Sequence, residues 1–256
     1  MMRALWIAGS GMRAQQLNID VVSHNLSNVN TTGFKKSRVE FQDLLYETIR
    51  PAGTRQGIPV GLEVGHGVRA AATLRQFSTG SLQETGNPLD LAIEGPGFFA
   101  LELPDGTIAY TRDGSFKLDA DGCLVSSSGY WLQPEVVIPP EATDIAISPD
   151  GAVSYLLHGK RVEGDRITLV SFSNPAGLEA AGRNLYRYTE AAGEMMTDLV
   201  PGEGCGTLAA NYLELSNVQV VEEMINMIVA QRAYEINAKA IQAADEMLGM
   251  ANNLRR

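Results

Sequence analysis

Few side chains in this sequence could do chemistry, and those that could lie far apart along it. The three histidines are His24, His66 and His158. His24 falls in a region of helical periodicity, where a polar surface or interface role explains it better than metal binding. His66 lies between two glycines and has no second ligand at the spacing that a zinc site needs. The histidines therefore predict no metal site.

Three other patterns could suggest a reaction, but each has a simpler structural explanation. Gly9-Ser10-Gly11 resembles the core of a nucleophile elbow, yet it lies inside a predicted helix with no strand before it. The glycines from Gly61 to Gly67 lack the order of a phosphate-binding loop. The adjacent carboxylates of Glu222 and Glu223 lie near the start of a predicted helix, where the helix dipole favours negative charge. We therefore expect no catalytic residue and no cofactor.

Charge and cysteine content exclude further classes. The formal net charge of −10 argues against nucleic acid or anionic lipid as the main partner, because both require a basic face. No run of residues approaches the roughly 18 apolar residues that cross a bilayer, so we expect no membrane-embedded segment. Cys123 and Cys205 form neither a disulfide framework nor a CxxC pair. The two cysteines could form one disulfide or remain two free thiols, and free thiols are favoured.

The chain begins with a long helical pattern. Its residues recur alternately three and four positions apart, which is typical of a coiled-coil seam. We expect Thr31-Thr32-Gly33 to end this helix, with Gly33 as a left-handed cap. The seam consists of Leu5, Ala8, Met12, Gln15, Ile19, Val22, Leu26 and Val29.

The end of the chain carries two such seams on one predicted helix, for which Ser216 is the expected N-cap. A single partner helix covers one seam, so two seams predict at least two neighbouring helices. The first seam consists of Met224, Met227, Gln231, Tyr234, Ala238, Ile241, Asp245 and Leu248. The second consists of Val229, Ala233, Ile236, Ala240, Ala243, Met247, Met250 and Leu254.

Between the helices the pattern changes to short alternating stretches. Asp-Gly pairs follow four of them, at Asp105-Gly106, Asp113-Gly114, Asp121-Gly122 and Asp150-Gly151. Asp-Gly between alternating apolar residues is a strong hairpin signal, because type I′ turns need positive φ at both central positions. The first three pairs lie at a regular spacing, which predicts up-and-down antiparallel strands.

These patterns predict an α+β fold with a nested domain plan. A discontinuous, coiled-coil-like helical domain comes from both termini, with an all-β antiparallel domain inserted into it. The expected ranges are 1–36 plus 212–256 for the helical core domain, 37–90 for an extended or loop connecting segment, 91–190 for the β-rich domain and 191–211 for a return linker.

The sequence resembles the bacterial flagellar rod and hook proteins in four separate motifs. They are SHNLSNVNTTGFK at residues 23–35, DLAIEGPGFF at residues 90–99, YTRDGSF at residues 110–116, and LSNV with EEMI and QRAYE between residues 215 and 235. Within this family the resemblance is closest to the distal rod branch. It rests on MRALWIA at residues 2–8, FQDLLYETIR at residues 41–50 and GLEVGHGVR at residues 61–69. The stretch between Arg50 and Gly61 is short for the family, and the cysteines belong to none of its motifs.

Seams and motifs together predict assembly residues on both helices. At the N-terminal helix they are Leu5, Ala8, Met12, Ile19, Val22, Asn25, Leu26, Asn28, Val29, Gly33 and Phe34. At the C-terminal helix they are Asn217, Val218, Met224, Met227, Gln231, Arg232, Tyr234, Ile236, Ile241, Met247 and Leu248.

The resemblance implies a structural subunit that polymerises into the helical tube of the distal rod, transmits torque and encloses an export channel. The implied partners are further copies, proximal rod proteins, the hook protein, the rod cap, the P-ring and L-ring proteins and the type III export apparatus. The implied place is the basal body, across the periplasm, reached without a cleavable signal peptide. A proximal rod subunit is the alternative within the family. A peptidoglycan-acting enzyme, which would need two placed carboxylates, is the alternative from another class.

Overall fold

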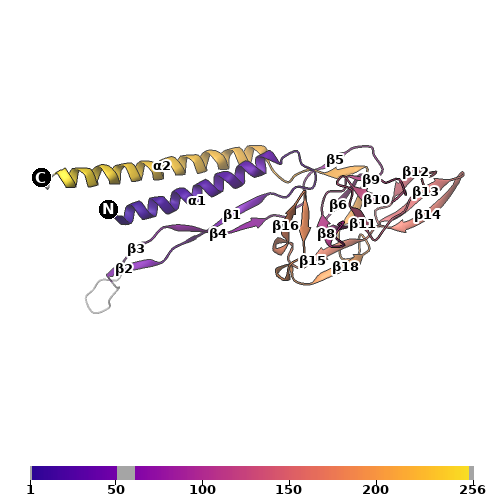
Figure 1. Cartoon of the computed structure of the whole chain (residues 1–256), viewed down its shortest axis with the longest axis horizontal. Coiled ribbons are helices and arrows are strands. Elements are labelled where there is room, and N and C mark those ends of the chain that lie inside the picture. The colour runs from indigo at the N-terminus through magenta and orange to yellow at the C-terminus, as the bar shows by residue number, and fades with distance from the viewer. Residues whose placement is uncertain (1, 51–60, 254–256) are drawn as a thin grey trace. The chain divides into compact units, whose positions relative to one another are not determined.

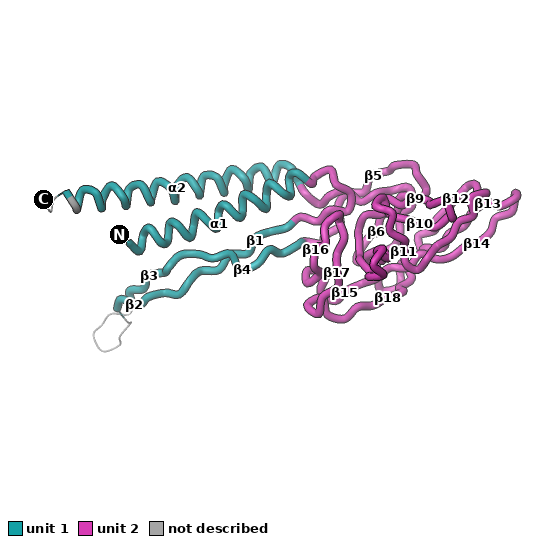
Figure 2. The backbone as a smooth tube through the Cα atoms, viewed as in Figure 1, with its two compact units in different colours: residues 1–27, 37–75, 219–256 teal, residues 28–36, 76–218 magenta. Residues whose placement is uncertain are grey.

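The computed structural model describes residues 2–50 and 61–253. These residues form two compact units, coloured separately in Figure 2. Unit 1 takes its described residues from the ranges 1–27, 37–75 and 219–256, and unit 2 consists of residues 28–36 and 76–218. Strands fill the chain between two long terminal helices, so the predicted α+β class with a β unit between the helices is confirmed (Figure 1). Leu254 of the second predicted seam and the short stretch between Arg50 and Gly61 lie outside the described residues.

Unit 1 contains both helices, α1 (Met2–Ser27) and α2 (Val220–Asn253). Two predicted helix ends were wrong. Helix α1 ends at Ser27, so Val29 lies in a turn, and Gly33 does not cap the helix although its φ is 66°. The N–H of Gly33 instead donates to the carbonyl of Glu214 at 2.8 Å. Ser216 lies before the first turn of α2 and accepts a hydrogen bond from the Val218 N–H, so it is no N-cap.

Two strand pairs complete unit 1. Strand β1 (Ser37–Asp43) pairs antiparallel with β4 (Val68–Arg75), and a bulge interrupts the pair between Glu40 and Phe41. Strand β2 (Tyr46–Arg50) pairs antiparallel with β3 (Leu62–Gly65). Helix α1 contacts α2 on one side and β1 and β4 on another (Figure 1).

Unit 2 is built of antiparallel strands, as predicted for the β domain. Its largest sheet has seven strands in the order β16-β17-β8-β7-β11-β10-β9, and a second sheet has the order β12-β13-β14. The remaining pairs are β15-β18, β19-β6 and β20-β5. The bounds are β5 (Leu82–Glu84), β6 (Leu91–Glu94), β7 (Phe99–Glu102), β8 (Ile108–Thr111), β9 (Phe116–Leu118), β10 (Leu124–Ser126), β11 (Trp131–Gln133), β12 (Thr143–Ile147), β13 (Ala152–Leu157), β14 (Lys160–Arg166), β15 (Leu169–Phe172), β16 (Glu179–Gly182), β17 (Leu185–Arg187), β18 (Met195–Leu199), β19 (Thr207–Ala210) and β20 (Tyr212–Glu214). Short 3-10 helices lie at η2 (Pro175–Gly177) and η3 (Glu190–Ala192).

Three of the four Asp-Gly pairs close hairpins, but not with the expected turn. At Asp105-Gly106, Asp121-Gly122 and Asp150-Gly151 the glycine has positive φ while the aspartate does not. This is the pattern of a type I turn followed by a left-handed glycine, so the predicted type I′ turn was wrong. Asp113-Gly114 closes no hairpin, because β8 pairs with β7 and β17 while β9 pairs with β10. The predicted up-and-down order was also wrong, since β11 lies between β7 and β10.

The buried apolar side chains are distributed unequally between the units. Both hydrophobic clusters of the described chain lie in unit 2, and the larger one includes Phe99, Phe116, Leu132, Ile138 and Ile167. In unit 1 the buried apolar residues are mostly small: Ala8, Ala14, Val22, Val39, Ala230 and Ala244. Unit 1 therefore gains less from apolar burial than unit 2 does.

Candidate assembly surface

A buried amide joins three elements of unit 1. Asn25, in the last turns of α1, is 1% exposed. Its side chain accepts a hydrogen bond from the Ser37 N–H at 3.0 Å and donates to the Ser37 carbonyl at 2.8 Å. It also donates to the carboxylate of Glu223, in the first turn of α2, at 3.2 Å. Glu223 thus has a specific partner in addition to the helix dipole.

A buried ionic cluster, formed by Lys35, Arg112 and Glu214, lies in unit 2. The Nζ atom of Lys35 lies 2.5 Å from one Glu214 carboxylate oxygen, and Nη1 of Arg112 lies 3.4 Å from the other. The Lys35 side chain also donates to the Ser78 carbonyl at 2.7 Å. Burial lowers the pKa of Lys35, against the opposing attraction of Glu214. Sequence analysis missed this cluster. Its one local signal is Glu214, which lies between Leu213 and Leu215 in the sequence.

Six of the predicted assembly residues lie in unit 2, in the segments that follow α1 and precede α2. Phe34 and Val218 are buried and Gly33 lies close to Asp113. Asn217 accepts a hydrogen bond from the Lys36 N–H at 2.7 Å and donates to the Gln76 carbonyl at 2.9 Å. Asn28 and Val29, in the turn after α1, are half-buried. The six that lie outside both helices are Asn28, Val29, Gly33, Phe34, Asn217 and Val218.

The predicted α1 seam is covered within the chain. Ala8 and Val22 are buried, and the other helical seam residues are half-buried. The half-buried members are Leu5, Met12, Gln15, Ile19 and Leu26.

The covered side of α2 differs from the predicted first seam. Of its eight residues four are half-buried, namely Met227, Ala238, Ile241 and Leu248. The other four, Met224, Gln231, Tyr234 and Asp245, are exposed. Covered positions outside the predicted seam are Glu223, Ala230, Asn237 and Ala244. This rotation of α2 about its axis brings Glu223 to Asn25 and places the Asn237 amide beside Gly11. A Cβ atom added to Gly11 would lie 2.9 Å from Nδ2 of Asn237. Polar and small residues thus decide which side of α2 is covered.

The described residues of the second predicted seam of α2 are exposed except Ala233, which is half-buried. We call the exposed apolar side of α2 that they share with Val221, Ile225 and Ile228 the free face. Ile236 is 66% exposed and Val229 is 62% exposed. No residue of the described chain covers this side, which also carries the exposed residue Arg232. The free face consists of Val221, Ile225, Ile228, Val229, Ile236, Ala240, Ala243, Met247 and Met250.

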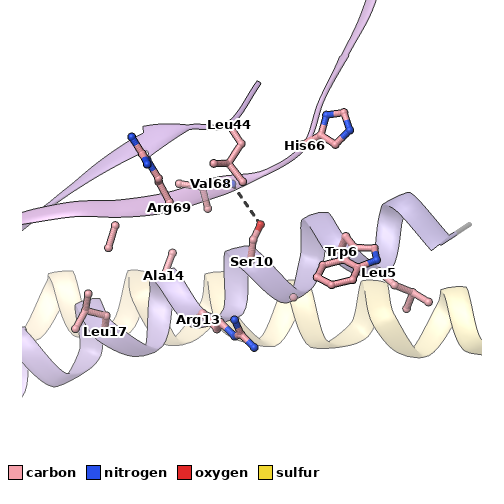
Figure 3. A pocket seen from close by; sticks show the side chains of 12 residues that line it. Leu5, Trp6, Ser10, Arg13, Ala14, Leu17, Leu44, His66, Val68 and Arg69 are labelled. Carbon is pink, nitrogen blue, oxygen red and sulfur yellow. Dashed lines mark hydrogen bonds between the residues drawn. The ribbon is translucent and has the colours of Figure 1, made fainter. Parts of the chain in front are cut away.

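A groove of about 660 Å³ lies beside α1 in unit 1 (Figure 3). Trp6, which is 76% exposed, borders it. The hydroxyl of Ser10 donates to the Ile7 carbonyl at 2.8 Å. It also accepts from the Val68 N–H at 3.3 Å, and the dashed line in Figure 3 marks this second bond. Ser10 therefore holds α1 against β4. The groove is lined by Leu5, Trp6, Gly9, Ser10, Arg13, Ala14, Leu17, Leu44, His66, Val68, Arg69 and Ala70.

The reactive side chains of the described chain have structural partners. Both cysteines are free thiols. A hydrogen bond to Glu135 raises the pKa of Cys123, and burial raises the pKa of Cys205, so both thiols resist ionisation. Within residues 2–50 and 61–253, no group of three or more His, Cys, Asp or Glu side chains could hold a metal ion. In the same ranges, neither helix is apolar enough over a sufficient length to cross a membrane.

Comparison with known families defines the class of protein. Residues 5–35 match the model described as flagella basal body rod protein, and residues 92–155 match the flagellar hook protein FlgE/F/G D1 domain. Residues 209–254 match the C-terminal model of the flagellar basal body rod FlgEFG proteins. Together the three models define the rod and hook proteins of the bacterial flagellum.

Full-length relatives narrow this class. The chain is 52% identical to the flagellar basal-body rod protein FlgG of Borreliella burgdorferi, over 100% of both chains. It is 47% identical to FlgG of Caulobacter vibrioides, over 99% of this chain and 100% of that one. It is 41% identical to FlgG of Bacillus subtilis, again over 100% of both. The chain belongs to the FlgG-type family of flagellar basal-body rod proteins.

Proposed function

We propose that this chain is a structural, non-catalytic subunit of the distal rod, where copies join by heterologous contacts into an open helical tube. The free face of α2 carries this proposal. Its exposed isoleucines, valines and methionines remain in water unless a neighbouring molecule covers them. Full-length identity to named rod proteins supports a flagellar rod as the place where such neighbours occur.

The predicted assembly residues have two roles in this proposal. Those exposed on α2, such as Ile236 and Met247, contact neighbouring copies in coiled-coil-like packing. The covered ones, such as Ala8 and Val22, hold the helix pair in the shape that assembles. The helical core domain of residues 1–36 plus 212–256 forms the contacts between copies. The segments 37–90 and 191–211 connect the β-rich domain of residues 91–190 to this helical domain.

The proposed tube transmits torque from the motor to the hook and encloses the export channel. Its partners are proximal rod proteins, the hook protein, the rod cap, the P-ring and L-ring proteins and the type III export apparatus. In this proposal the chain crosses the periplasm within the basal body, and it reaches that place by flagellar export.

Electron microscopy of basal bodies tests this function. We expect a strain without this chain to keep the proximal part of its rod and to lack everything beyond it. Expression of the chain should restore the distal rod and motility. Loss of the whole rod would assign the chain to the proximal rod, and an intact rod would refute a rod function.

A further inference from the structure

One face of the seven-stranded sheet in unit 2 is covered over only part of its area. On β7 and β8, Ala100 and Tyr110 are buried in one hydrophobic cluster with Phe172 of β15. Glu102 and Ile108 lie two positions away from them on the same two strands, so their side chains point to the same face. Ile108 is 51% exposed, so the cover ends between these positions.

Strand register places five side chains of the uncovered part in one row. Residues that are paired directly across neighbouring strands carry their side chains on the same face. Glu102 is paired with Ile108 on one side and with Trp131 on the other, and two further pairs continue the row. Four strand spacings separate its ends, which gives a strip about 19 Å long. This set, which we call the Trp131 row, consists of Lys117, Val125, Trp131, Glu102 and Ile108, in the strand order β9-β10-β11-β7-β8.

The Trp131 row presents apolar surface to water. Trp131 is 45% exposed, and Val125 beside it is half-buried. Single exposed apolar residues are common on protein surfaces, but several of them in a row around an aromatic ring are typical of a binding site. An indole is rigid and flat, so it suits a ligand that has a flat apolar face of its own.

Two polar side chains of the row have capacity for further hydrogen bonds. In the described chain the Glu102 carboxylate accepts one hydrogen bond, from Nε2 of Gln133 at 2.5 Å. A carboxylate has about four acceptor positions, so most of this capacity is open. Lys117 is exposed, and its ammonium group pairs with no side chain among the described residues. One cation and one anion make the row neutral, on a chain whose formal net charge is −10.

These groups together match the chemistry of a sugar. A pyranose ring has a flat C–H face that packs on an indole, and hydroxyl groups on its edge donate to a carboxylate and accept from an ammonium group. A nucleobase also stacks on an aromatic ring, but the phosphates of a nucleic acid require a basic surface. A lipid chain would exclude water from Glu102 without supplying a hydrogen-bond donor.

We propose that the Trp131 row binds a neutral polysaccharide strand of β-linked pyranose sugars. One sugar ring packs on the indole of Trp131 and donates a hydroxyl hydrogen bond to Glu102, while a ring farther along the strand accepts from Lys117. The row contains one carboxylate, whereas hydrolysis of a glycosidic bond uses two, so the sugar is bound without cleavage. This site goes beyond the proposed rod function and does not depend on it, because its residues all belong to unit 2.

Titration with the soluble tetramer of N-acetylglucosamine, a β-linked oligosaccharide, tests the site. In a chain with Trp6→Phe, Trp131 is the single tryptophan, and its fluorescence should change saturably as the tetramer is added. Calorimetry should show an affinity lowered by about tenfold or more in Trp131→Ala and in Glu102→Gln. Glu102→Gln keeps the size of the side chain, so it tests the site even if Trp131→Ala does not fold.

Tyr188→Ala is the matched control. Tyr188 is also an aromatic residue of unit 2 that is 45% exposed, but it lies outside the Trp131 row, so this variant should bind like the unsubstituted chain. The absence of saturable binding up to about 10 mM tetramer would overturn the proposal, as would unchanged affinity in Glu102→Gln. A change of Trp131 fluorescence that follows the concentration of the chain itself, without sugar, would assign the row to a protein partner instead. None of these results bears on the rod function, which microscopy of basal bodies tests separately.

Discussion

Among single residues, Glu214 has the most demanding environment in unit 2. Its carboxylate is fully buried between Lys35 and Arg112, and it also accepts the Gly80 N–H at 2.8 Å. The Nε atom of Arg112 has no acceptor in the described chain, although its other nitrogens donate to Ile93 and Gly95. Each buried charge in such a cluster depends on its partners, because an isolated charge is costly to remove from water.

Glu214→Gln should therefore destabilise unit 2 strongly. The change leaves two buried cations without a counter-charge, and we expect the free energy of unfolding to fall by about 3–5 kcal/mol. Denaturant unfolding of the chain with Trp6→Phe, followed by Trp131 fluorescence, measures the change. Glu84→Gln, on the neighbouring exposed strand β5, is the same chemical substitution and should cost less than about 0.5 kcal/mol. Equal effects of the two substitutions would contradict a special role for the cluster.

The sequence could predict some of these residues but not their partners. Lys35, Arg112 and Asn25 all fall inside the motifs that resemble the flagellar family, so their segments were recognised. The pairing of Lys35 with Glu214 joins positions at opposite ends of the chain, and no local pattern encodes such a pair. Asn25 was expected at a surface between copies, yet its amide is hydrogen-bonded inside the chain.

At the scale of elements, Asn25 connects α1, β1 and α2. Asn25→Ala should remove all three of its hydrogen bonds and leave the partly buried Ser37 backbone groups and the buried Glu223 with fewer partners. We expect unit 1 to lose about 2–4 kcal/mol of stability, since each buried polar group left unpaired costs about 1–3 kcal/mol. The midpoint of helix melting, measured by far-UV circular dichroism, reports this loss. Gln16→Ala, exposed on the same helix, should leave the midpoint nearly unchanged.

The two sides of α2 should respond differently to the same substitution. Ile236→Asp changes the free face. In the dilute chain it should change the free energy of unfolding of unit 1 by less than about 0.5 kcal/mol, while rod assembly is lost. Ile241→Asp places a carboxylate on the covered side and should lower stability by about 2–4 kcal/mol. The two changes have equal helix propensity costs, which makes each the control for the other. Normal rod formation by the Ile236 variant would refute the role of the free face.

Periodicity predicted the existence of both helices and of two apolar seams on the second. It did not predict which side of α2 the chain itself covers. The predicted seam begins at Met224, whereas the covered side begins one position earlier, at Glu223. Only the tertiary contact of Glu223 with Asn25 distinguishes the two. The Asp-Gly pairs predicted hairpins correctly at Gly106, Gly122 and Gly151. At Gly114 the same pair fails, because the backbone there lies against the carbonyl of Leu91 and leads to another part of the unit.

Across the whole molecule, the units differ in how much apolar surface they bury. The aromatic and branched residues of both hydrophobic clusters stabilise unit 2, while unit 1 buries mainly alanines and valines. We therefore expect unit 1 to be the less stable unit in a dilute chain and to gain stability when neighbouring copies bind it.

Thermal unfolding should consequently occur in two steps. Helix content, followed by far-UV circular dichroism, should be lost at a lower temperature than the environment of Trp131 changes. Trp6→Phe removes the tryptophan of unit 1, so that fluorescence then reports on unit 2. Assembly into rods should move the first step to higher temperature and leave the second nearly in place. A single coincident transition in the dilute chain would contradict the difference between the units.

The position of Asn25 also has a mechanical consequence for the rod proposed above. Its bond to Glu223 lies where α1 ends and α2 begins, while farther along the pair the buried apolar side chains are alanines such as Ala14 and Ala244. Contacts between small side chains allow close approach but change little when one helix slides past another, whereas a directional hydrogen bond is lost at once. Under shear the pair of α1 and α2 therefore resists sliding where Asn25 bonds Glu223 and slides more easily farther along. Torsional strain should concentrate at Asn25, Ser37 and Glu223, where sliding is resisted.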